Sequence, residues 1–222
     1  MTSIIHTNWN QIVANFRDLR GVTNTVVLSA MHEAGHAAMA IWAGADLELV
    51  SIRSTPKFGG RTEWSVPDIG RRRTDDEALG VNLSEYQIVM AGSIAEELLD
   101  NAIRSQAYNN LGRPSWEMDA ADLKKIDERS GGVIRATGID YAAEARRVLR
   151  QYEDEVDYLA TALIYRIDLT GGEARSLCKG LAREGRFNRD INYGTTADRR
   201  ARFVELKRLG FAGPDIDFLS AA

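Results

Sequence analysis

The sequence is poor in proline, histidine and cysteine. Its 222 residues include four prolines, three histidines and one cysteine. The single cysteine, Cys178, excludes both an internal disulfide framework and a cysteine-rich zinc site. The net charge of −4 argues against nucleic acid as the main partner.

Long hydrophobic runs are also missing. No stretch reaches the roughly 18 uninterrupted apolar residues that a membrane-spanning helix needs, so we expect no membrane span. The N-terminus shows no charged region followed by an apolar core, so we expect no signal peptide and a cytoplasmic location. The hydrophobic content of 44% and charged content of 27% favour one globular domain over residues 1–222.

Two of the three histidines fall within one motif, His32-Glu33-Ala34-Gly35-His36. Histidines at i and i+4 on a helix lie on the same face, so both imidazoles can bind one metal ion. The intervening glutamate can then act as a general base towards water at the metal, as in zinc peptidases. The alternative, a buried helix with two hydrogen-bonded histidines, is less favourable because burying unliganded polar groups is costly. Gly35, a poor helix former, indicates that another element packs very close to this turn.

The remaining pattern predicts a mainly α fold with a small β-hairpin or sheet beside the metal-binding helix. That helix is expected to begin near the capping residues Thr23 and Asn24 and to end near Ala43. Two β-prone segments, 46–55 and 61–66, predict a hairpin. Residues 67–83 and 102–114 have the composition of loops, and Ser84 with Gln87 forms a capping-box pattern. Further helices are expected at 8–19, 85–101, 116–129, 141–167 and 170–181.

The motif supplies two metal ligands, whereas catalytic zinc usually takes three protein ligands and one water. The other histidine, His6, lies close to the N-terminus, so a carboxylate further along the chain is the better candidate. Glu96 and Glu97 occupy one predicted helix, and Asp119 and Asp122 lie at i and i+3 on the next. Spacing alone does not decide between these carboxylates.

An ordered set of segments resembles the peptidase domain of the FtsH-type zinc metalloprotease family. The histidine motif and hairpin come first, followed by Ala-Gly-Ser-Ile-Ala-Glu-Glu-Leu at 91–98, which resembles the family's Gly-Gly-Arg-x-Ala-Glu-Glu-Leu helix. Ala-Asp-Leu at 121–123 resembles its Asn-Asp-Leu, and residues 169–173 resemble its Leu-x-Gly-Glu turn. The resemblance covers residues 25–182 and leaves 183–222 as a C-terminal extension.

The resemblance implies a zinc-dependent endopeptidase with His32, His36 and Asp122 as ligands and Glu33 as general base. It further implies that Glu96 or Glu97 orients a ligand histidine through its other ring nitrogen. An extended polypeptide substrate would add to the edge strand of the hairpin.

The chain also departs from that family. Ser93 replaces the arginine, and the segment between Glu97 and Asp122 is longer, so Asp119 stays the alternative to Asp122. The family carries an ATPase module and a membrane anchor, whereas this sequence has no Gly-x-x-x-x-Gly-Lys-Ser/Thr phosphate loop. We therefore expect cleavage of unfolded or small proteins without an ATPase of its own. The alternatives are a peptidase subunit served by a separate ATPase, in an oligomer or alone, and a non-catalytic zinc-bound interaction or regulatory module.

Overall fold

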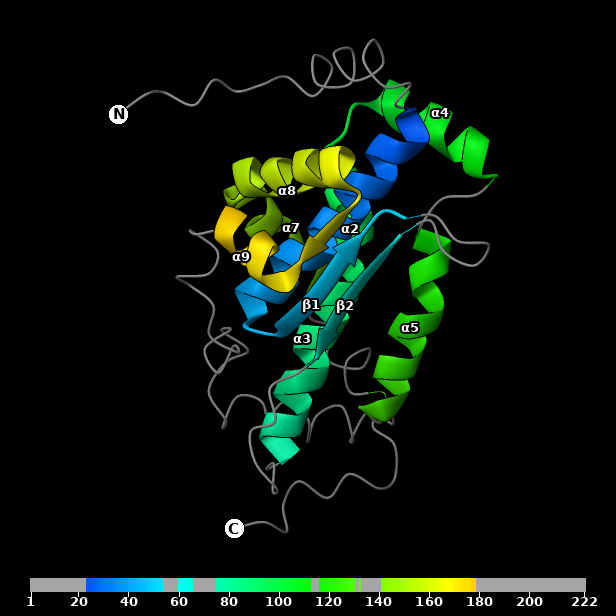
Figure 1. Cartoon of the computed structure of the whole chain (residues 1–222). Coiled ribbons are helices and arrows are strands. Elements are labelled where there is room, and N and C mark those ends of the chain that lie inside the picture. Colours follow the sequence, from blue (N-terminus) through cyan, green and yellow to red (C-terminus); the bar gives the residue numbers. More distant parts are fainter. Residues whose placement is uncertain are drawn as a thin grey trace.

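The computed structural model describes residues 23–53, 60–65, 75–112, 116–130, 132 and 141–178, and the expected helix at 8–19 and the extension 183–222 lie outside them. The described part is mainly helical and includes a three-stranded antiparallel sheet, as expected for the fold class (Figure 1). The elements follow the order α2 (Asn24–Ala43), β1 (Asp46–Ser51), β2 (Arg61–Ser65), α3 (Asp75–Glu96), α4 (Asn101–Leu111), α5 (Trp116–Arg129), α7 (Tyr141–Gln151), α8 (Glu153–Arg166), β3 (Asp168–Thr170) and α9 (Gly171–Leu177).

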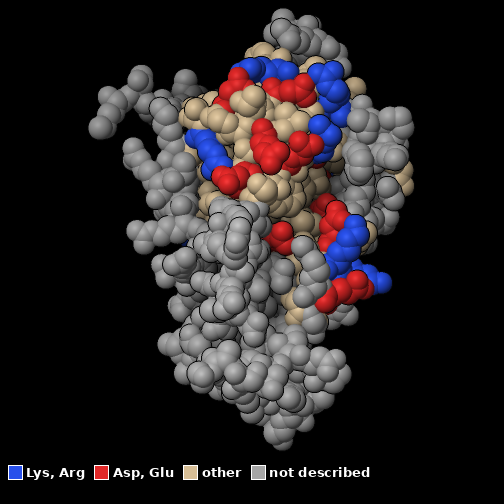
Figure 2. All heavy atoms as spheres, turned by 60° about the horizontal axis from the view of Figure 1, so that its bottom comes forward, with Lys and Arg blue, Asp and Glu red and all other residues tan. Residues whose placement is uncertain are grey.

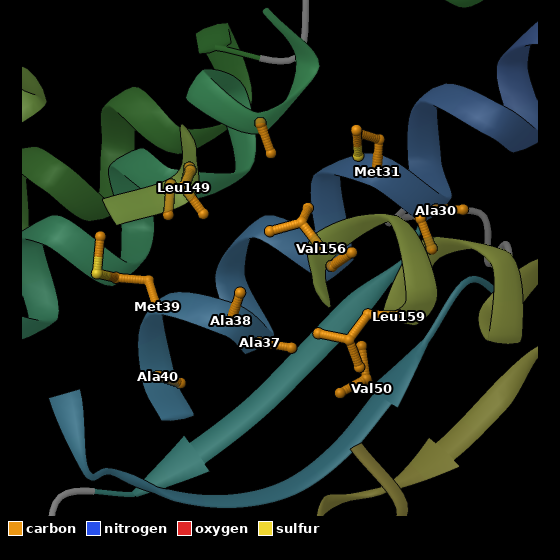
Figure 3. Packing of buried hydrophobic residues seen from close by; sticks show 14 of the residues in the cluster. Ala30, Met31, Ala37, Ala38, Met39, Ala40, Val50, Leu149, Val156 and Leu159 are labelled. Carbon is orange, nitrogen blue, oxygen red and sulfur yellow. The ribbon is translucent and has the colours of Figure 1, made fainter. Parts of the chain in front are cut away.

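Helix α2 is the central element, and it carries the histidine motif. The side chain of Thr23 caps its first turn by accepting a hydrogen bond from the backbone N–H of Val26. Gly44 ends it in the left-handed conformation, with φ of 76°. Almost all of α2 is buried, and side chains from α7, α8 and β1 meet it in one large core (Figure 3). The motif therefore stands on a helix held on several sides.

The sheet has the strand order β2-β1-β3, and both pairings of β1 are antiparallel. The expected hairpin is confirmed as β1 and β2, with an irregularity in register between Leu47 and Leu49. The third strand, β3, was not expected, because three residues are too few to produce an alternating pattern. Within the described residues β2 pairs only with β1, so its other side is an edge of the sheet.

Three expectations about helices were wrong. Helix α3 begins at Asp75 rather than near residue 85, and Ser84 is buried within it instead of capping it. Residues 102–111, expected to be loop, belong to α4, whose first turn is capped by Asp100. The single helix expected at 141–167 is divided at Tyr152 into α7 and α8.

These differences have a common cause. Polar residues are abundant at 75–83 and throughout α4, and such a composition alone is typical of loops. In α4, the packing of Ile103 and Ala107 against the large core supports the helix. Tyr152 separates α7 from α8, and no proline or glycine marks the break in the sequence. Local sequence therefore carries little information at these positions.

Acidic and basic side chains are interspersed over the described surface that Figure 2 shows. On that face the described residues form no extended patch of a single sign, in keeping with the small net charge of −4. None of the helices in the described part of the chain has the length and apolar character needed to cross a membrane.

Candidate metal centre

The two histidines of α2 face one another. The Nε2 atoms of His32 and His36 lie 2.9 Å apart, and their ring centroids are 4.5 Å apart in an edge-to-face arrangement. This is the geometry expected for residues at i and i+4 on a helix. Both imidazoles therefore point at the same small region.

The hydrogen bonds of the Nδ1 atoms determine the protonation of the two rings, and hence where their lone pairs lie. His32 Nδ1 lies 2.8 Å from Glu96 Oε1, and His36 Nδ1 lies 2.7 Å from the carbonyl oxygen of Ile88. A carboxylate and a carbonyl are acceptors, so each Nδ1 carries a hydrogen and donates it. In the neutral rings both Nε2 atoms then present lone pairs to each other. Two lone pairs at 2.9 Å repel unless a cation, either a proton or a metal ion, lies between them.

A carboxylate from α5 completes the group. Asp119 Oδ1 lies 3.6 Å from His32 Nε2, and the ligand atoms of His32, His36 and Asp119 all lie within 4.8 Å of one another. Ser93 Oγ on α3 donates a 2.5 Å hydrogen bond to Asp119 Oδ2, which leaves Oδ1 directed at the histidines. These three residues could hold a metal ion.

The structure brings Asp119 to the histidines and leaves Asp122 away from them. Asp122 has a side chain that is 59% exposed, and its Oδ1 accepts a hydrogen bond from Lys125. On α5 the buried residues Asp119, Ile126 and Asp127 occupy one arc. At 3.6 residues per turn, Asp122 lies about 40° beyond Ile126, outside that arc. The expectation of Asp122 as third ligand is therefore not met by this geometry, and its alternative, Asp119, takes the position.

The donor set fits a divalent transition-metal ion. Imidazole nitrogens and a carboxylate oxygen bind zinc at about 2.0–2.2 Å, so two ligand atoms of a tetrahedral site lie about 3.3 Å apart. The observed separations of 2.9 Å and 3.6 Å bracket that value. The contacts behind the two candidate ligands also agree with such a site, because His32 and His36 each donate their Nδ1–H to an acceptor, Glu96 and the Ile88 carbonyl respectively.

The site is buried, and its charges are coupled. His32, Glu33, His36 and Asp119 are 7%, 5%, 7% and 9% exposed. Burial lowers the pKa of His32, but the neighbouring carboxylates of Asp119 and Glu96 outweigh it and raise that pKa to about 10. Burial and the charge on His32 lower the pKa of His36. Burial raises the pKa of Asp119, but the two histidines and Ser93 outweigh it and hold it below its usual range. Without metal, the histidine pair therefore carries one proton in addition to the two Nδ1 hydrogens, and with it one positive charge.

The candidate base, Glu33, is fixed by strand β2. Thr62 Oγ1 donates a 2.7 Å hydrogen bond to Glu33 Oε2. Gly60 approaches so closely that a Cβ atom there would lie 2.7 Å from Glu33 Oε1. The carboxylate of Glu33 also acts electrostatically on both histidine rings. Its orientation is thus set by the start of β2 as well as by α2.

Two glycines let α3 reach the histidines. A Cβ atom on Gly35 would overlap Ala91 O and Ala95 Cβ of α3, which confirms the close approach expected at this turn. A Cβ atom on Gly92 would overlap the ring of His36 and would lie 2.7 Å from His32 Cε1. Helices α2 and α3 therefore meet closely where the ligands lie.

Of the two glutamates expected to orient a histidine, Glu96 contacts His32 and Glu97 does not. Glu97 forms an ion pair with Arg146 on the surface, at 2.9 Å. The sequence reasoning missed Tyr108, whose hydroxyl donates to Glu96, because its segment has the composition of a loop. It also missed Trp64, which stacks on His36 with ring centroids 6.2 Å apart. Like Thr62, Trp64 lies on β2, and no local signal tells how a hairpin sits against a helix.

Comparison with known proteins does not assign the chain to a family. No protein-family model matches this chain, and no curated protein matches it. The resemblance to FtsH-type peptidases therefore rests on the motifs alone.

Proposed function

We propose that the protein is a zinc-dependent endopeptidase that hydrolyses peptide bonds of unfolded or small protein substrates. The observation that carries the proposal is the convergence of His32, His36 and Asp119 on one point, with Glu33 fixed on the same helix turn. Zinc suits two imidazoles and one carboxylate, and a fourth position would be left for water or substrate.

Each residue then has a defined task. His32, His36 and Asp119 would hold the ion, and Glu96 and Ser93 orient two of these ligands. Zn²⁺ held there would supply Lewis acidity, which polarises a carbonyl group and makes water more acidic. Glu33 takes the proton of the attacking water and passes it to the leaving amine. Thr62 keeps the Glu33 carboxylate in one orientation, so little reorganisation is needed as the proton moves.

A single substitution separates metal binding from proton transfer. Glu33→Gln keeps the size of the side chain and its contact with Thr62 but removes the base. We expect this variant to retain zinc, measured by atomic emission, and to cleave an unfolded casein at least about 100-fold more slowly. Glu97→Gln is the matched control, because Glu97 lies at the surface and pairs with Arg146. Equal cleavage by the parent and Glu33→Gln would contradict the proposal.

Burial favours a second candidate, the non-catalytic zinc-bound module. All four central residues are at most 9% exposed, whereas a peptidase must admit a polypeptide to the ion. The same assay distinguishes the two functions. A parent protein that holds zinc but leaves casein intact would support the module, and zinc-dependent cleavage that Glu33→Gln abolishes would exclude it.

A further inference from the structure

Helix α4 lies next to the metal centre although it contributes no ligand. Its residues Ile103 and Ala107 are buried in the large core that also surrounds α2. Asn24 Nδ2, at the start of α2, donates a 2.9 Å hydrogen bond to Gln106 Oε1 of α4. The position of α4 relative to α2 is thus set by both apolar packing and a polar contact.

One side chain of α4 reaches the outer shell of the site. Tyr108 Oη donates a 2.5 Å hydrogen bond to Glu96 Oε2, and the other oxygen, Oε1, accepts from His32 Nδ1 at 2.8 Å. Glu96 is 1% exposed, so solvent does not compete for its oxygens. A continuous hydrogen-bonded path therefore runs from α4 through α3 to the ring of His32.

The two ends of this path constrain the carboxylate together. A carboxylate that is held through both oxygens cannot rotate about its last side-chain bond without breaking one contact. The orientation of Glu96 in turn fixes the plane of the His32 ring, and hence the direction in which Nε2 points. If the hydroxyl were lost, one of the contacts that hold the Glu96 carboxylate would be missing, and the direction of Nε2 would be less well defined.

We propose that Tyr108 is a positioning residue of the metal centre that acts on His32 through Glu96. The inference rests on the metal-binding part of the proposed function and does not require catalysis. It assigns to α4, a segment with the composition of a loop, the task of keeping one ligand aligned. The ring of Tyr108 packs against the large core, so Tyr108→Phe removes the hydroxyl and keeps the packing.

The test measures the binding of zinc alone, by competition with a chromogenic chelator. Losing an outer-shell partner costs about 10–100-fold in metal affinity, so we expect Tyr108→Phe to raise the dissociation constant about tenfold. Tyr158→Phe is the matched control, because Tyr158 is 43% exposed on α8, and its affinity should equal that of the parent. The visible absorption of the Co²⁺-loaded proteins should change in Tyr108→Phe only, which a loss of stability alone would not cause.

A double-mutant cycle shows whether the effect passes through Glu96. In a Glu96→Gln background, Tyr108→Phe should have much less effect on zinc affinity than in the parent. Additive effects, or an unchanged affinity and Co²⁺ spectrum in Tyr108→Phe, would overturn the inference and leave the proposed peptidase standing. Zinc binding weakened as expected, in a protein that cleaves no casein, would support the inference and contradict the peptidase. A parent that binds no zinc would overturn both.

Discussion

The metal centre has two sides that differ in how they are held. His32 and His36 come from α2, which is buried in the large core and packed closely against α3 at Gly35. Asp119 comes from α5, which packs against α3 and shares a second, smaller cluster formed by Val89, Ile126 and Tyr141. The α2 side is therefore preorganised by the main core, whereas the α5 side depends more on local contacts around the site itself.

The comparison shows which parts of the fold position each ligand of the metal centre. A pair of histidines four residues apart is fixed by the helix that bears them, so their mutual geometry needs little from the rest of the fold. The third ligand must be brought from another helix, and its placement depends on Ser93 and on the packing of α5. We expect the α5 side to be the more easily disturbed, and four predictions examine that contrast.

The largest effect is expected on the α5 side itself. Asp119→Asn should weaken zinc binding by more than the roughly 100-fold that losing an outer-shell partner can cost, because it removes a charged ligand. Asp122→Asn is the matched control on the same helix, since its side chain faces solvent, and its zinc affinity should stay the same. Chelator competition measures both. If Asp122→Asn were the variant that lost zinc, the ligand set described above would be incorrect.

A somewhat smaller effect is expected at the contact between α2 and α3. Gly35→Ala places a methyl group against Ala91 O and Ala95 Cβ, so we expect overpacking to cost about 3 kcal/mol. The gain in helix propensity offsets about 1 kcal/mol of that, which leaves a net loss near 2 kcal/mol in the free energy of unfolding. Urea unfolding of the metal-free protein measures it. Gly172→Ala in α9 is the control, because nothing lies within 4 Å of the added Cβ and stability should not fall.

The third effect concerns the proton that competes with the metal on the α2 side. The folded-state pKa of His32 is raised from 6.5 to about 10, so its proton stabilises the metal-free fold below pH 6.5, and that stabilisation is lost as the pH rises through about 10. Zinc must displace this proton, so its affinity should rise about tenfold per pH unit between about pH 7 and pH 9. Calorimetric titration in buffers of different ionisation enthalpy should report about one proton released per zinc. Release of none would show that the pair is already neutral.

The smallest effect compares the two clusters directly. Ile88→Val and Ile126→Val each remove one methylene from a buried residue of α3 and α5 respectively. We expect Ile88→Val to cost about 1.5 kcal/mol, and Ile126→Val about 0.5 kcal/mol because the smaller cluster can relax around the change. Urea unfolding of the metal-free proteins measures both. Equal losses would mean that the smaller cluster around α5 is as firmly packed as the large core.

The same contrast explains what could be predicted from the sequence. The start of α2 after its cap Thr23, its end at Ala43, the hairpin, and the bounds of α5 all depend on sequence signals that lie within a few residues. The same holds for the histidine pair and its close-packed glycine. Each of these features is encoded locally, and each was expected correctly.

Features that depend on distant contacts were not predictable in this way. Asp119 and Asp122 are indistinguishable by spacing, and only the rotation of α5 about its axis brings one of them to the histidines. Thr62 and Trp64 reach the site because of how β2 lies against α2. Tyr108 does so because packing makes a helix from a polar segment. Tertiary packing determines which of these side chains reach the metal centre, and the local sequence carries no signal for it.

The arrangement of ligands also gives the metal a mechanical role. Residues 36 and 119 are far apart in the sequence, and an ion held between them would act as a cross-link that joins α5 to the central helix. Such a cross-link stabilises the folded state by mass action, because the unfolded chain does not hold the ligands together. Its contribution falls mainly on α5, whose own cluster is small, and much less on α2. In the metal-free protein α5 would then be the first helix to separate from the rest of the fold by local unfolding. An ion bound at the site would keep α5 in place.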